Sequence, residues 1–77
     1  MEDAIPLQFV TSGSSATILH VDGRPTEVQR LAELGVACGK PLEVIQGGSP
    51  CIVQLDGARL CLRYDKNECH VLVRVGQ

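Results

Sequence analysis

The chain has 77 residues, with seven lysines and arginines against nine aspartates and glutamates, for a formal net charge of −2. This length suits a single domain over residues 1–77, because two domains would each be too short to bury a core. Hydrophobic residues make up 44% of the chain and aromatic residues only 3%. We therefore expect a packed core and no nucleic-acid binding, which needs a positive field or aromatic faces for base stacking.

The first half of the chain predicts one strand followed by one short helix. A first strand is expected over Ala16–Val21, and a turn containing Pro25 interrupts it. Thr26 and Gln29 have the spacing of a capping box, in which the threonine hydroxyl accepts from the backbone N–H three residues later. The helix is therefore predicted from about Thr26 to Leu34.

The helix carries an apolar stripe and a defined end. Val28, Leu31 and Leu34 are spaced so that they share one face, which we expect to cover one side of the sheet. Gly35 is predicted to end the helix in the left-handed conformation, with Val36 packing back on Leu31 as in a Schellman motif.

The second half predicts a strand and then a tight hairpin. Leu42–Gln46 alternates apolar and polar residues as a half-buried strand does. Cys51–Leu55 and Ala58–Arg63 flank Asp56 and Gly57, the pair of residues that type I′ turns prefer. This register pairs Leu55 with Ala58 and Cys51 with Leu62. The residues predicted to share the core face are Cys51, Val53, Leu55, Leu60 and Leu62, whereas Cys61 points outward.

A last strand is expected over Cys69–Val75, after a polar turn at Asp65–Glu68. Its inward residues would be Val71, Val73 and Val75. We expect it to form a second hairpin with the preceding strand, pairing Leu62 with Val71. The fold class is therefore mainly β, a small barrel of about five antiparallel strands with one short helix, because closing the sheet removes exposed edges.

The chain shows no sign of export or of membrane insertion. No apolar run approaches the roughly 18 residues that span a bilayer, and the first nine residues carry two acids rather than a basic segment. We therefore expect a cytoplasmic protein whose four cysteines are free thiols. Their spacing matches no zinc or redox motif. These cysteines are Cys38, Cys51, Cys61 and Cys69.

The order of several short motifs resembles the FeoA family, ferrous iron transport protein A. The segment from Arg30 to Val36, followed by Gly39 and by the strand from Leu42, looks like the family's signature. The remaining elements that resemble the family are Gly13, Ala16 and Ile18 before the helix, Pro50 and Gly57 in the hairpin, and Leu60, Cys61, Leu62 and Arg63 after its turn. The resemblance covers nearly the whole chain.

The resemblance implies an SH3-like barrel and a non-enzymatic accessory of ferrous iron uptake. Its partner would be the cytosolic part of the membrane ferrous iron permease, which carries a GTPase domain. The sequence agrees in lacking the phosphate-binding, nucleophile-elbow and zinc-protease motifs. No cofactor is expected. The alternative is a small metal carrier or sensor that binds Fe²⁺ or Zn²⁺ through Cys and His, the side chains that prefer these metals.

The metal candidates for that alternative are Cys61, His70 and His20, which are outward-facing and would give at most a weak site. For the partner, the predicted second hairpin lines up Ile52, Cys61 and Leu72 as one apolar row across three strands, rimmed by arginines. Such a row favours an acidic, partly apolar partner surface. The full predicted partner-binding set is Ile52, Arg59, Cys61, Arg63, His70, Leu72 and Arg74.

Overall fold

The structure is a computed structural model that describes residues 4–48, 50–62 and 69–76. In chain order its elements are β1 (Ile5–Pro6), the 3-10 helix η1 (Leu7–Phe9), β2 (Ser15–Gly23), α1 (Pro25–Glu33), β3 (Pro41–Gln46), β4 (Cys51–Leu55), β5 (Ala58–Leu62) and β6 (Cys69–Val75). Within these residues, no helix is long and apolar enough to cross a membrane.

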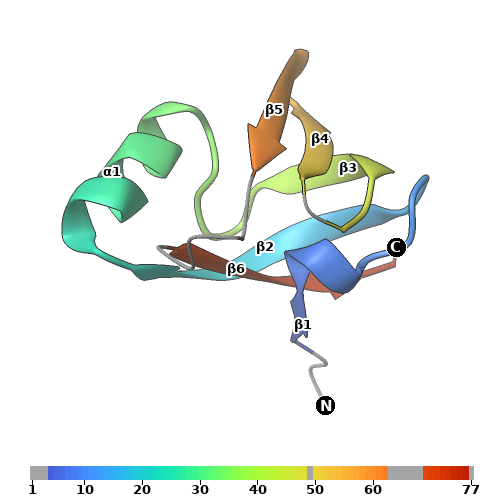
Figure 1. Ribbon diagram of the computed structural model, residues 1–77, viewed down its shortest axis with the longest axis horizontal. Helices are drawn as coiled ribbons and strands as arrows, with labels where there is room; N and C mark the ends of the chain where they lie inside the picture. The colour runs from blue at the N-terminus through green and yellow to red at the C-terminus, as the bar shows by residue number, and fades with distance from the viewer. Residues whose placement is uncertain (1–3, 49, 63–68, 77) are drawn as a thin grey trace.

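The strands form one antiparallel sheet in the order β1-β6-β2-β3-β4-β5. Figure 1 shows β4 and β5 standing away from the layer of β2 and β6, with α1 at one end of the molecule. The predicted mainly β class with one short helix is confirmed. The strands number six in the described residues rather than five, because Ile5–Pro6 adds a strand beside β6. Among the described residues the sheet does not close, since β1 and β5 are its two edges.

The beginning of α1 differs from the prediction. The helix starts at Pro25, its N-cap is Arg24, and no side chain caps it. The capping box between Thr26 and Gln29 is therefore wrong. Proline at the first helical position explains the difference, because its fixed φ suits the helix and its missing N–H needs no partner there.

The end of α1 is as predicted. Gly35 has a φ of +100°, and its N–H donates to the Ala32 carbonyl at 3.0 Å. The Val36 N–H donates to the Leu31 carbonyl at 2.8 Å. These two bonds define the Schellman motif and satisfy carbonyls that the helix leaves open.

The β4–β5 hairpin is also confirmed. Asp56 and Gly57 both have positive φ, 52° and 79°, as a type I′ turn requires. All pairs of the predicted register are present, from Leu55 with Ala58 to Cys51 with Leu62.

The predicted second hairpin is wrong. β6 does not pair with β5 in the described residues but lies between β1 and β2, with Val71 opposite Val21 and Val73 opposite Ile18. The predicted turn at Asp65–Glu68 lies outside the described residues. Beside β2, the two inward valines of β6, Val71 and Val73, are buried. The prediction had instead paired β6 with β5, its neighbour in sequence.

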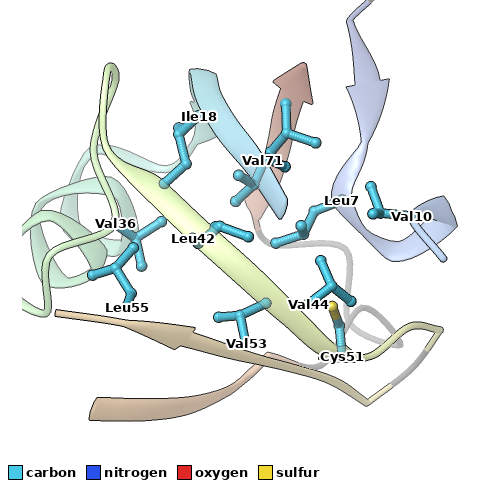
Figure 2. Packing of buried hydrophobic residues seen from close by; sticks show 12 residues of the cluster. Leu7, Val10, Ile18, Val36, Leu42, Val44, Cys51, Val53, Leu55 and Val71 are labelled. Atoms are coloured by element: carbon cyan, nitrogen blue, oxygen red, sulfur yellow. The ribbon is translucent and has the colours of Figure 1, made fainter. Parts of the chain in front are cut away.

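The core is built mainly from β2, β3, β4 and β6, together with Leu7, Val10 and Val36. Figure 2 shows Val36 and Leu55 pointing toward one another and Cys51 close to Val44. The buried residues are Leu7, Val10, Ala16, Ile18, Val36, Leu42, Val44, Cys51, Val53, Leu55, Val71 and Val73. Leu60 and Leu62 are partly buried against this cluster, so the predicted core face of the hairpin is present.

Two predicted core residues are exposed. Leu34 is 49% exposed and Val75 is 40% exposed. The helix contributes no fully buried residue, because the Gly35 turn sends Val36 rather than Leu34 into the core. Val75 lies beyond Val73, the last residue of β6 that β1 covers.

A β-bulge sets which β2 residues face the core. Ile18 pairs with Val73 and His20 pairs with Leu72, so Leu19 is an extra residue in β2. The bulge turns His20 outward and keeps Val21 against the core, because side chains alternate along a strand and one extra residue reverses the alternation.

Candidate partner-binding surfaces

The outer face of the β4–β5 hairpin brings together one group of the predicted residues. Ile52 lies directly opposite Cys61, and Arg59 lies two residues from Cys61 on the same face. Cys61 and Arg59 are exposed and Ile52 is half-buried. Their rigid register follows from the two-residue turn, which fixes the pairing of both strands.

The charge of this face comes from Arg59. Gln54 lies opposite Arg59, and Glu43 lies opposite Gln54 on the next strand. Strands are about 4.8 Å apart, so two steps place the backbones of Glu43 and Arg59 roughly 10 Å apart. Arg59 forms no ion pair in the part of the chain that the structure describes. Arg59 is therefore an exposed cation of this face, and Glu43 lies two strands away in the same row.

The outer face of β6 carries the second group. His70 and Arg74 are exposed and Leu72 is half-buried. Leu72 lies between Pro6 of β1 and His20 of β2, and these neighbours account for its partial burial. His70 lies opposite Asp22, and Arg74 lies opposite Thr17.

The two groups do not form the predicted row. β2 and β3 lie between β6 and β4 in the sheet. Leu72 on β6 and Ile52 on β4 are therefore not cross-strand neighbours. The row was predicted from the hairpin between β5 and β6, which is absent from the described residues. Arg63 lies outside the described residues. A partner-binding role for the remaining residues stays a prediction.

The thiols differ in their surroundings. Cys38, Cys51 and Cys61 are free, Cys51 is buried, and the other two are exposed. Burial raises the pKa of the Cys51 thiol, and the nearby Cys61 raises it further. The Cys38 thiol donates to the Leu19 carbonyl at 3.1 Å, which satisfies a backbone acceptor at the bulge.

The candidate metal ligands are not assembled as one set. His20 lies diagonally across from His70 on β2 and β6, whereas Cys61 is on β5 at the edge of the sheet. Across residues 4–48, 50–62 and 69–76, no group of three or more His, Cys, Asp or Glu side chains is arranged to hold a metal ion.

Two further surface features were not predicted. Phe9, in η1, is 73% exposed. A single aromatic residue in a short segment has no periodicity that would have revealed its exposure. A shallow depression is lined by Ser14, Ser15, Val75 and Gly76. None of these four residues supplies an acid, a base or a charged group for catalysis.

Comparison with known proteins shows what this chain is similar to. The FeoA domain model matches residues 5–75. A crystal structure described as an iron uptake regulatory protein, FeoA, superposes with a TM-score of 0.82 at 21% sequence identity, covering 96% of this chain and 100% of that chain. The match is consistent with the predicted SH3-like fold. No curated protein matches the chain.

Proposed function

The chain belongs to the FeoA family, and from that premise we propose that it is a non-enzymatic accessory protein of ferrous iron uptake. It acts in the cytoplasm by binding the cytosolic part of the membrane ferrous iron permease, which carries a GTPase domain. The observation that carries the proposal is the match of the FeoA domain to residues 5–75. The similar crystal structure, which is of an iron uptake regulatory protein, supports it.

The contact surface is proposed to include the outer face of β4–β5, the outer face of β6, or both. The first offers Ile52, Arg59 and Cys61, and the second offers His70 and Leu72 beside Arg74. Each combines a cation or histidine with an apolar side chain, as protein interfaces commonly do. Because the two faces lie on separate parts of the sheet, separate substitutions can distinguish them.

The test is a binding titration of the full chain against the isolated cytosolic domain of the permease, with variants in each face. Arg59→Glu reports on the β4–β5 face, and His70→Glu reports on the β6 face without disturbing the half-buried Leu72. Arg30→Glu, on the exposed side of α1, makes the same change of charge as Arg59→Glu and is its control, although it also breaks the 3.5 Å ion pair between Arg30 and Glu27. Loss of binding in either face variant, with Arg30→Glu unaffected, is the expected result.

Absence of binding by the unaltered chain would contradict the proposal. Loss confined to Arg30→Glu would move the contact to the helix side. The melting temperature of each variant is the control for folding. It is expected to stay close to that of the parent, because substitutions of exposed residues change stability little.

We also propose that the protein holds no resident metal or other cofactor. Anaerobic equilibration with Fe²⁺ tests this against the alternative of a metal carrier. Stoichiometric, tight uptake that is lost in Cys61→Ser or His70→Ala would favour the carrier, and weak uptake unaffected by both substitutions would favour the accessory role.

A further inference from the structure

The two edges of the sheet differ in how they are protected. β1 has only two residues, one of which is Pro6, and short strands and prolines prevent further pairing at an edge. β5 has five residues without proline, and it pairs with β4 along its whole length without a bulge. In the described residues β5 pairs with β4 alone. Figure 2 shows it running beside β4 at the border of the sheet. Within residues 4–48, 50–62 and 69–76, the edge at β5 is therefore regular and unpaired.

The hairpin register identifies which backbone groups face that edge. A two-residue turn is closed by the hydrogen bond from the Ala58 N–H to the Leu55 carbonyl, so these two residues form a hydrogen-bonded pair. Hydrogen-bonded and non-bonded pairs alternate along antiparallel strands. Leu60 and Leu62 therefore bond to β4, whereas Arg59 and Cys61 direct their N–H and C=O groups toward the open edge.

The side chains of β5 indicate what kind of strand would fit there. Leu60 and Leu62 face the core side but are only partly buried, so apolar residues opposite them would complete their burial. Arg59 is exposed on the outer face without an ion pair in the described part of the chain. An acidic residue directly opposite Arg59 would form a favourable cross-strand pair.

We propose that β5 accepts an extended segment of a partner protein as an additional antiparallel strand, with an acidic residue opposite Arg59 and apolar residues opposite Leu60 and Leu62. Backbone hydrogen bonds to Arg59 and Cys61 supply affinity, and the alternating side chains supply selectivity.

A second copy of this chain fits this edge less well. Two β5 strands paired about Leu60 would place Arg59 opposite Cys61 and bring the two Arg59 side chains into diagonal positions on one face. That arrangement supplies no acidic partner, and like charges on neighbouring strands are unfavourable.

The probe is a synthetic, end-blocked heptapeptide of alternating valine and glutamate, titrated into the full chain labelled with ¹⁵N. Its control replaces the glutamates by lysines. We expect saturable shifts of the Arg59 and Cys61 amides, slower hydrogen exchange at both, and binding of the glutamate peptide roughly tenfold tighter than binding of the lysine peptide. Arg59→Glu is expected to reverse this preference. Shifts centred on another element, or no preference between the peptides, would overturn the proposal.

Cys61→Pro tests the role of the backbone. It removes an N–H that faces the open edge while leaving the bonds of Leu60 and Leu62 to β4 in place, and proline is tolerated at such edge positions. Cys61→Ser keeps the N–H and is the matched control. We expect the proline variant to lose peptide binding and the serine variant to keep it. Equal binding by both would overturn the proposal, and if the proline variant does not fold, the reversal in Arg59→Glu decides.

Analytical sedimentation distinguishes the two possible occupants of the β5 edge, a segment of a partner protein and a second copy of this chain. A dimer that forms in the absence of peptide, and that Cys61→Pro disrupts, would make a second copy the occupant and overturn the assignment to an acidic segment. The inference goes beyond the proposed function. Because the titration uses no permease, its failure leaves the proposed function standing, and loss of permease binding leaves the peptide result standing.

Discussion

Replacing Gly35 by alanine is expected to destabilise the domain by two separable effects. Gly35 has a φ of +100°, and a side chain in the left-handed region costs about 1 to 2 kcal/mol. An added Cβ would also lie 2.5 Å from Cδ2 of Leu55, which is 2% exposed and has little room to move. Overpacking of this kind costs about 1 to 3 kcal/mol. Together the effects approach the roughly 3 to 5 kcal/mol that a core of this size supplies.

Urea unfolding followed by circular dichroism measures the loss, and Gly39→Ala is the matched control. Gly39 has a φ of +90°, and nothing lies within 4 Å of the place that an added Cβ would take, so alanine there incurs only the backbone cost of about 1 to 2 kcal/mol. Shortening Leu55 to valine removes the overlapped atom, so Gly35→Ala should cost less in that background. Equal losses in Gly35→Ala and Gly39→Ala, or an unchanged cost in the Leu55→Val background, would refute the reasoning from packing.

Leu31→Ala is expected to lower the free energy of unfolding by about 1 to 2 kcal/mol and Leu7→Ala by about 2 to 5 kcal/mol, because Leu31 is partly buried and Leu7 is fully buried. Equal losses measured by urea unfolding would contradict the shallow packing of α1 on the core. In the native protein a thiol reagent is expected to label the exposed Cys61 quickly and the buried Cys51 only through unfolding. Burial, and then the nearby Cys61, also raise the pKa of Cys51, which lowers its reactivity. Mass spectrometry of labelled peptides measures both rates, and equal rates would contradict this prediction. Because the raised pKa keeps Cys51 protonated in the folded state, its contribution to stability is present below about pH 8.5, where the unfolded thiol ionises, and is lost as pH rises toward the folded pKa. Urea unfolding at pH 7 and pH 9.5 should therefore show a smaller alkaline loss in Cys51→Ala than in the parent, and an identical loss in both would argue against the raised pKa.

Local features were predictable from the sequence because few neighbouring residues decide them. Gly35 ends the helix and Asp56 with Gly57 turns the hairpin, in each case because positive φ excludes most other side chains. The hairpin turn then determined the complete register of β4 and β5. For the same reason the two open backbone positions at Arg59 and Cys61 follow from the sequence once the turn is assigned.

The order of the strands could not be obtained in this way. An alternating strand such as Cys69–Val75 can pair with any other amphipathic strand, and only the burial of Val71 and Val73 against distant residues selects β2 over β5. The bulge at Leu19 gave no local signal either, although it decides that His20 faces outward.

For the predicted partner-binding residues, too, one part followed from the sequence and another part only from the tertiary structure. The sequence by itself determined that Ile52, Arg59 and Cys61 share one face, since a turn of two residues leaves a single register. Only the tertiary structure decided that Leu72 lies apart from them and that β5 is an edge of the sheet in the described part of the chain, because pairing between strands far apart in the chain depends on which arrangement buries the most apolar surface at once.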